Sequence, residues 1–305
     1  MKKIFLALML LIGAISANAV DYLVQTGAAG DPVWDESVVT ATGATVVDLT
    51  ASATTIDAWL AANAGGKETW LAGGTYTFAA SCANPAMTLY GGFAGTETSI
   101  GQRAKGANAW DFTNETIFDA NGKWMFSDKG TMLQHIDGVT MKNSANNANI
   151  GTFRPGNNSI INQCKFINNK STANNGQGGA LMFYNANATV SDCYFEGNEG
   201  GQGGAIYANC ATQTLTVTGC YFKNNFVHSA STTGNAGGAV HFQNGGNYTI
   251  DRCVFTGNHA DSNKNGAAVS FAGANESSSI TNCVFYANGS TKHALYIAAG
   301  NVINN

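Results

Sequence analysis

Residues 190–198 read VSDCYFEGN, and residues 217–225 read VTGCYFKNN. Both stretches contain the pattern Cys-x-Phe-x-x-Asn, here named the Cys-Phe-Asn motif. Five copies begin at Cys164, Cys193, Cys220, Cys253 and Cys283, so successive copies are 29, 27, 33 and 30 residues apart. A fixed unit joined by segments of variable length is typical of a solenoid, in which each repeat packs mainly against its neighbours.

A second block recurs between the motifs. It reads GGALMF from Gly178, GGAIYA from Gly203 and GGAVHF from Gly237, and weaker copies begin at Gly266 and Lys292. An apolar residue also lies three positions before each motif cysteine. Each period therefore holds three short apolar alternations, which predict strands, separated by Asn, Gly, Ser and Thr, which favour turns. We predict an all-β protein, a parallel β-helix with three short strands per coil.

Stacked coils place equivalent positions above one another at the strand spacing of about 4.8 Å. The five motif phenylalanines are expected to form one inward column, and the apolar residues of the second block another: Leu181, Ile206, Val240, Val269 and Leu295. Burial of each such side chain contributes roughly 1.5–3 kcal/mol. The motif asparagines fall at a turn, where stacked amides can form a hydrogen-bonded ladder; any one of them can instead be a surface turn residue. Weaker copies lie upstream, at Ile136, Val139 and Met141 and at residues 149–153.

Residues 1–19 have the features of an export signal. Lys2 and Lys3 precede an apolar run over residues 4–15, and Ala17-Asn18-Ala19 matches a cleavage site. We therefore expect export through the Sec pathway, to the cell surface, the outer membrane or the medium. The predicted domains are a signal peptide at 1–19, an N-terminal segment and cap at 20–68, and the β-helix at 69–305.

The period is absent from residues 20–68. Ile56, Trp59 and Leu60 have helical spacing and predict a short helix near 55–63. Such a helix covers the open end of a solenoid, whose exposed strand edges otherwise aggregate. A strand is expected at 69–78, and residues 70–78 and 86–93 are expected to form an irregular first coil. The insert at 95–114 has the richest mix of side chains, Glu97, Arg103, Trp110 and Asp111, and is interpreted as a structural loop.

Composition restricts the partners. Only 11% of residues are charged, against about 25% in an average protein. Removing Lys2 and Lys3 with the leader lowers the net charge from −4 to −6, which argues against nucleic acid and anionic membranes. No stretch after the leader approaches the roughly 20 apolar residues of a membrane span.

The seven cysteines suggest disulfides in an exported protein. However, five share one inward position, where the strand spacing of about 4.8 Å exceeds the Cβ–Cβ distance of about 3.8 Å in a disulfide. We expect these five to be buried thiols, and leave the state of Cys82 and Cys210 open. No Cys-x-x-Cys pair occurs, and the histidines keep no ligand spacing with the cysteines, so we predict no metal site and no cofactor.

The repeats resemble a known family. Gly-Gly-Ala followed by Phe-x-x-Asn is similar to the repeats of polymorphic outer-membrane proteins, and residues 87–99, MTLYGGFAGTETS, resemble a segment of secreted bacterial β-helix repeat proteins. The resemblance spans roughly residues 55 to 305. It implies a right-handed parallel β-helix of the pectin-lyase-like superfamily and a secreted or surface location, with adhesin-like roles in some members. It carries over no catalytic residues, and this chain shows no barrel or C-terminal sorting domain.

Catalysis and binding are both compatible with this fold. Polysaccharide lyases and hydrolases need paired carboxylates, or a Lys or Arg base with acidic calcium ligands, on one outer face. After the leader the only arginines are Arg103, Arg154 and Arg252, and no Asp-Asp pair or Gly-His-Gly occurs. We therefore expect a non-catalytic structural or adhesive protein that binds glycans or surface proteins of a host or the environment. A polysaccharide-active lyase or hydrolase is the alternative.

Two outward columns are the candidate binding surface. The second block is expected to present Met182, Tyr207, His241, Ser270 and Tyr296, and the motif strands Lys165, Tyr194, Tyr221, Val254 and Val284. Exposed aromatic rings can stack on sugars, which selects Tyr194, Tyr207, Tyr221, His241 and Tyr296 as candidate ligand contacts. Tyrosine also has high β-propensity, so a purely structural interpretation stays open.

The chain ends in mid-repeat. Ile303 aligns with the apolar position three before a cysteine, so the cysteine position falls one residue past Asn305. A solenoid normally ends in a polar capping element. We therefore expect further coils downstream of residue 305, with an anchoring or sorting domain as one option.

Overall fold

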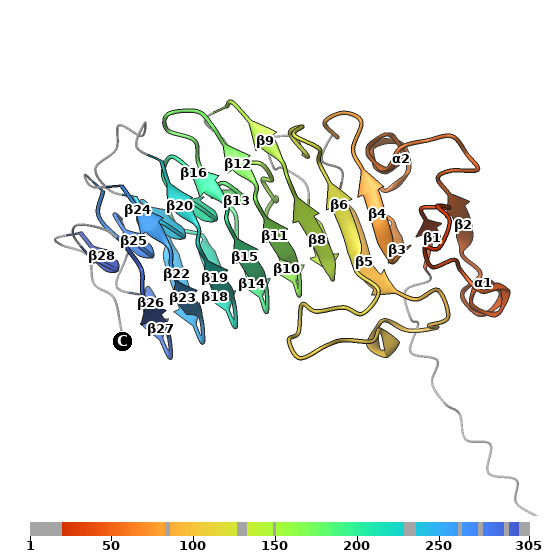
Figure 1. Ribbon diagram of the computed structural model, residues 1–305. Helices are drawn as coiled ribbons and strands as arrows, with labels where there is room; N and C mark the ends of the chain where they lie inside the picture. Colours follow the sequence, from red (N-terminus) through yellow and green to blue (C-terminus); the bar gives the residue numbers. More distant parts are fainter. Residues whose placement is uncertain are drawn as a thin grey trace, which may run out of the picture.

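The computed structural model describes residues 20–82, 86–126, 133–148, 151–228, 236–261, 264–273, 277–289 and 293–298. The signal peptide predicted at 1–19 and the alignment of Ile303 lie outside the described residues. Short strands stack along one axis from the N-terminal end to β28, as Figure 1 shows. Every pairing between neighbouring strands of its four sheets is parallel, which confirms the predicted parallel β-helix solenoid.

The four sheets are here named A to D in the order in which the chain enters them within a coil. Sheet A holds ten strands: β2 (Thr45–Asp48), β1 (Tyr22–Gln25), β3 (Glu68–Ala72), β5 (Met87–Phe93), β7 (Gln134–Asp137), β10 (Ser159–Asn162), β14 (Ala188–Ser191), β18 (Thr214–Thr218), β22 (Asn247–Asp251) and β26 (Ser279–Thr281). Sheet B holds eight: β4 (Gly74–Thr77), β6 (Thr116–Asp119), β8 (Val139–Lys142), β11 (Lys165–Ile167), β15 (Tyr194–Glu196), β19 (Tyr221–Lys223), β23 (Val254–Thr256) and β27 (Val284–Tyr286).

Sheets C and D hold five strands each. Sheet C contains two-residue strands: β9 (Ala145–Asn146), β12 (Lys170–Ser171), β16 (Glu199–Gly200), β20 (Phe226–Val227) and β24 (His259–Ala260). Sheet D contains β13 (Leu181–Tyr184), β17 (Ile206–Asn209), β21 (Val240–Gln243), β25 (Val269–Phe271) and β28 (Leu295–Ile297). Sheets A, B and D are the three predicted strands of each coil. The sequence predicted three strands per coil, but the structure has a fourth, because the residues after the motif asparagines also pair with their equivalents in neighbouring coils.

Two sharp bends in each coil are built from left-handed backbone. The residue before each motif cysteine has positive φ, as at Asp192 (51°) and Gly219 (63°), and so does the residue before each motif asparagine, as at Asn224 (53°) and Gly257 (63°). Asn, Asp and Gly adopt this conformation at the lowest cost. The first bend joins sheet A to sheet B and the second joins sheet B to sheet C, so the motif encodes two corners.

The core follows the predicted columns. Phe195 pairs with Phe222 in register, and their rings stack at 4.7 Å; the other neighbouring pairs of this column lie at 4.8 or 4.9 Å. Leu181 pairs with Ile206, and Ile206 with Val240. The upstream copy at Ile136, Val139 and Met141 is also confirmed, since Ile136 pairs with Ile161 and Met141 with Phe166. The start of the second upstream copy, residues 149–150, lies outside the described residues.

The motif asparagines form the predicted ladder. Nδ2 of Asn198 donates to the carbonyl oxygen of Phe166 at 2.9 Å and to Oδ1 of Asn225 at 2.8 Å. Oδ1 of Asn198 accepts from the backbone N–H and from Nδ2 of Asn169, at 3.0 and 3.1 Å. Each central amide is buried and fully paired, so the ladder is structural and not part of the outer surface.

All seven cysteines are free thiols, including Cys82 and Cys210, whose state the sequence left open. Six are buried and Cys283 is half-buried. Cys193 accepts the N–H of Cys164 at 3.4 Å and donates to the carbonyl oxygen of Ser191 at 3.1 Å. The prediction of stacked thiols is confirmed.

The N-terminal segment contains more than the predicted helix. Helix α2 (Ile56–Asn63) is present where expected, and it buries Trp59 and Leu60 in the solenoid core. Strands β1 and β2 were not predicted; they extend sheet A, with α1 (Glu36–Thr42) between them. A second small core forms outside sheet A, where Trp70 stacks on Phe93 at 4.7 Å and Trp34 lies tilted against Phe93 at 5.3 Å.

Candidate functional site

The structure separates the two predicted aromatic columns. Tyr207 and His241 lie side by side on sheet D, with ring centroids 5.7 Å apart, but both are fully buried. The prediction that they face solvent was wrong, because both side chains are enclosed within the structure. Gln177, in the segment that precedes β13, donates from Nε2 to the hydroxyl oxygen of Tyr207 at 3.3 Å. Tyr296, farther along this column, is half-buried.

Tyr194 and Tyr221 are brought together on the outer face of sheet B. They pair in register on β15 and β19, and their ring centroids lie 5.8 Å apart. Trp110, from the loop between β5 and β6, stacks on Tyr194 at 5.7 Å and lies 6.4 Å from Tyr221 at an interplanar angle of 56°. This loop, residues 94–115, is here named the β5–β6 loop; it projects beside the lower ends of the strands in Figure 1.

The three rings border a groove with a volume of about 490 Å³. Its loop wall contains Asn108, Trp110 and Asp111. Its sheet wall contains two residues from each of β11, β15 and β19: Lys165, Ile167, Tyr194, Glu196, Tyr221 and Lys223. The groove therefore runs across three successive coils.

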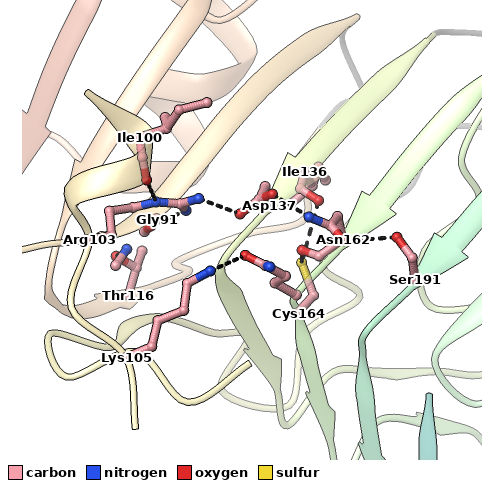
Figure 2. A network of polar contacts seen from close by, with 12 residues as sticks. Gly91, Ile100, Arg103, Lys105, Thr116, Ile136, Asp137, Asn162, Cys164 and Ser191 are labelled. Atoms are coloured by element: carbon pink, nitrogen blue, oxygen red, sulfur yellow. Dashed lines mark hydrogen bonds and ion pairs between the residues drawn. The ribbon is translucent and has the colours of Figure 1, made fainter. Parts of the chain in front are cut away.

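A buried arginine fixes the β5–β6 loop to the solenoid wall (Figure 2). Arg103 donates from Nε to the carbonyl oxygen of Ile100 at 2.8 Å and from Nη1 to that of Gly91 at 2.7 Å. Its Nη2 lies 2.8 Å from Oδ1 of Asp137. The guanidinium also lies 4.7 Å from the ring centroid of Phe112, within cation–π distance. All these contacts are internal, so Arg103 is occupied in holding the loop.

Further contacts order the same loop. Both oxygens of Glu97 accept the N–H of Ala94 at 3.0 Å, and Oε2 also accepts those of Gly95 and Thr96 at 3.1 Å. The short 3-10 helix η1 (Ile100–Gln102) follows, with a capping box between Ser99 and Gln102. Farther on, Lys105 donates to Oε1 of Gln163 at 2.6 Å. The groove wall that carries Trp110 is therefore held at several points, as a preformed binding site requires.

Ion pairs line the groove on both sides. Nζ of Lys165 lies 3.2 Å from Asp111 and 3.0 Å from Glu115, which joins the loop to sheet B. Nζ of Lys223 lies 2.8 Å from Oε1 of Glu196, and the other oxygen of Glu196 accepts the Tyr194 hydroxyl at 2.8 Å. Every charged side chain that lines the groove therefore has a partner of opposite charge.

These contacts determine the protonation states of Glu196, Asp111 and Tyr194 in the groove. Burial alone raises the pKa of Glu196, but the ion pair with Lys223 and the Tyr194 hydroxyl outweigh it and lower the pKa below its ordinary value. Burial likewise opposes the hydrogen bonds from Asn108 and Lys165 at Asp111, whose pKa is also lowered. Burial, with the nearby Glu196, raises the pKa of Tyr194 to about 12. At neutral pH both carboxylates are ionised and the phenol is protonated.

Sequence reasoning found half of this site. It identified Tyr194 and Tyr221, but it interpreted the segment with Trp110 and Asp111 as a structural loop. It did not select Glu196 and Lys223. The available signal was the unusual side-chain mixture at 95–114, in a chain with only 11% charged residues. No group of three or more His, Cys, Asp or Glu side chains able to hold a metal ion is found among the residues described.

Comparison with known proteins gives one short match. Residues 192–209 match the family model of the Chlamydia polymorphic membrane protein repeat. The matched stretch contains one Cys-Phe-Asn motif, strands β15 to β17 and the groove residues Tyr194 and Glu196. No curated protein and no solved structure shows a significant match. Within the described part of the chain, no helix is long and apolar enough to cross a membrane.

Proposed function

We propose that this protein is a surface or outer-membrane-associated β-helix that binds carbohydrate in the groove between the β5–β6 loop and sheet B. Two features support the location: the export signal predicted at residues 1–19 and the similarity of residues 192–209 to a polymorphic membrane protein repeat. The observation that carries the binding role is the aromatic cluster of Trp110, Tyr194 and Tyr221 beside the groove.

The geometry of the rings suits a sugar. The C–H groups on one face of a pyranose pack on an aromatic ring, and its hydroxyls extend sideways toward polar groups. Trp110 and Tyr221 meet at 56° and so form a wedge in place of a closed stack. Asn108, Lys223 and Glu196 line the same groove with donors and acceptors. A sugar ring that enters the wedge thus finds both kinds of contact.

Binding without turnover is favoured over the polysaccharide-active alternative. A glycosidase needs one protonated carboxyl group as general acid near neutral pH. Asp111 and Glu196, the carboxylates that line the groove, are instead stabilised in the ionised form by lysines. Tyr194, with a pKa raised to about 12, is a poor base at neutral pH. The groove therefore offers contacts for a sugar but no poised proton donor.

A glycan array followed by calorimetry tests the proposal. Wild-type protein is expected to bind a defined set of glycans, and Trp110→Ala and Tyr221→Ala to weaken that binding at least tenfold, equivalent to about 1.4 kcal/mol. The matched control is Tyr286→Ala, which removes an exposed tyrosine from β27 of the same sheet, outside the groove. Binding that survives both groove substitutions, or its absence from the wild type, would refute the role of this site. Release of reducing ends or unsaturated products would favour the enzyme alternative.

A further inference from the structure

The cations of the groove are already neutralised by protein carboxylates. Lys165 contacts Asp111 and Glu115 at 3.2 and 3.0 Å, and Lys223 contacts Glu196 at 2.8 Å. The Lys165 side chain is only 17% exposed and is enclosed between the loop and the sheet. An anionic ligand would have to displace a carboxylate to reach the ammonium group of Lys165; Lys223 is 43% exposed, but its charge is balanced by Glu196.

The arginines do not change this balance. Sites for carboxylates and sulfates commonly use the two-pronged guanidinium of arginine. No arginine lines the groove, and Arg103, the arginine of the β5–β6 loop, is turned inward to Asp137 and two backbone carbonyls. Counting Glu115, three carboxylates face two ammonium groups around the groove. An acidic sugar would therefore meet a neutral to slightly negative surface, on which each ammonium group is balanced by a protein carboxylate.

The paired carboxylates can still bind a neutral sugar. An ionised carboxylate has about four acceptor positions, and one or two ion-pair contacts leave others available to hydroxyl groups. Asp111 and Glu196 stand on opposite walls, one on the loop and one on β15. Hydroxyls on both edges of a sugar ring thus have acceptors, while the aromatic rings take its face.

From this arrangement we infer that the groove selects uncharged oligosaccharides over acidic ones, and that the Lys223–Glu196 and Lys165–Asp111 ion pairs set this preference. The inference rests on the proposed carbohydrate-binding function and names the class of sugar. The groove crosses β11, β15 and β19 in succession, so the bound chain lies along the solenoid axis.

The test compares a neutral and an acidic series by calorimetry. The neutral ligands are gluco-, manno-, xylo- and galacto-oligosaccharides, and the acidic ligands are oligogalacturonates of matched length. The wild type is expected to bind its best neutral ligand at least tenfold more tightly than any oligogalacturonate. Glu196→Gln keeps the side-chain size but leaves Lys223 without its carboxylate. Its ratio of acidic to neutral affinity is expected to rise at least tenfold.

Two further variants complete the design. Asp111→Asn removes a charge from the opposite wall and is expected to shift the ratio in the same direction, which provides an independent test if Glu196→Gln folds poorly. Glu199→Gln is the matched control, because it frees Lys170, 3.2 Å away on sheet C, without touching the groove. It is expected to leave the ratio unchanged.

The outcomes separate this inference from the proposed function. Wild-type protein that prefers oligogalacturonates would overturn the inference and leave carbohydrate binding intact. An unchanged ratio in both Glu196→Gln and Asp111→Asn, or an equal change in Glu199→Gln, would overturn the assignment of selectivity to these ion pairs. Absence of binding to both series and to the wider array would overturn the proposed function itself.

Discussion

Nη2 of Arg103 lies 2.8 Å from Oδ1 of Asp137, and the two side chains are only 4% and 8% exposed. Arg103 belongs to the β5–β6 loop, whereas Asp137 ends strand β7 in the solenoid wall. The other oxygen of Asp137 accepts Nδ2 of Asn162 at 2.6 Å, and Oδ1 of Asn162 accepts the Ser191 hydroxyl at 2.8 Å. A polar chain over three coils of sheet A therefore ends in the residue that holds the loop with Trp110.

Breaking this pair should both destabilise the protein and release the loop. Arg103→Met leaves the Asp137 carboxylate buried without its partner, which costs about 3–5 kcal/mol. Thermal unfolding is expected to show a clear fall in Tm, and limited proteolysis a new cleavage within residues 94–115. Lys67→Met is the control, because the Lys67–Asp21 pair is exposed and worth about 0–1 kcal/mol. Equal effects of the two substitutions would contradict the anchoring role.

The stacked core and the amide ladder should contribute unequally to stability. Phe222→Ala removes a ring stacked between Phe195 and Phe255 and is expected to cost roughly 3–5 kcal/mol through the cavity that it leaves. Asn225→Ala removes the side-chain donor to the Phe195 carbonyl and leaves the buried backbone N–H of Asn198 without its acceptor, Oδ1 of Asn225. Its expected cost is smaller, about 1–3 kcal/mol. Denaturant unfolding of both variants measures the difference, and the opposite order would mean that the ladder matters more than the core.

Repetition made the fold predictable from sequence. The register Phe195 to Phe222 and the weaker match of Met141 to Phe166 follow from spacing alone, because each coil repeats the same two corners. Strands β1 and β2 follow no period, and their place in sheet A depends on contacts with β3. Such contacts leave no local signal in the chain.

The groove between the β5–β6 loop and sheet B was predictable only on its sheet wall. Strand alternation correctly turned Tyr194 and Tyr221 outward, but alternation cannot show what covers an outward residue. The same reasoning failed at Tyr207 and His241, which are buried; Tyr207 is contacted by Gln177 from the segment that precedes β13. The position of Trp110 over Tyr194 likewise depends on a long-range anchor, the Arg103–Asp137 pair, which no spacing rule indicates.

A glycine that permits close backbone contact between coils should tolerate no side chain. A Cβ atom at Gly204 would lie 2.0 Å from the carbonyl oxygen of Gly238 and 2.6 Å from the backbone nitrogen of Phe226. Backbone atoms in paired strands cannot move aside, so Gly204→Ala is expected to lower Tm strongly or prevent folding. Gly101→Ala, where a Cβ atom meets nothing within 4 Å, is expected to leave Tm nearly unchanged. Similar Tm values for the two variants would argue against this close backbone contact between coils.

The cysteine column should be chemically protected while the protein is folded. Four of the five motif thiols are buried beyond the reach of an alkylating reagent, whereas the fifth, Cys283, is only half-buried. Iodoacetamide is expected to modify the half-buried Cys283 first and the other motif cysteines only after unfolding. Mass spectrometry under non-reducing conditions identifies both the alkylated cysteines and any disulfides. A disulfide between any two motif cysteines would show that the register is wrong.

Stability should depend on pH through a buried histidine. His241 is fully buried against Tyr207, and Nδ1 has no hydrogen-bond partner within the described structure. Burial lowers the pKa of His241 from 6.5 to about 3. Between these values the unfolded chain binds a proton that the folded protein does not. The stability that comes from keeping His241 neutral is thus fully present above pH 6.5. As the pH falls toward 3, the free energy of unfolding decreases by up to about 1.4 kcal/mol per pH unit.

Removing the titrating group isolates this effect. His241→Phe keeps an aromatic ring of similar size beside Tyr207 but binds no proton at any pH in the range. Denaturant unfolding at pH 4 to 7.5 is expected to show a steeper loss of stability on acidification in the wild type than in the variant. Contributions of the carboxylates are the same in both proteins, so they cancel in the difference. If the two pH profiles stay parallel, His241 is not held neutral by burial and the outer face of sheet D is open to water.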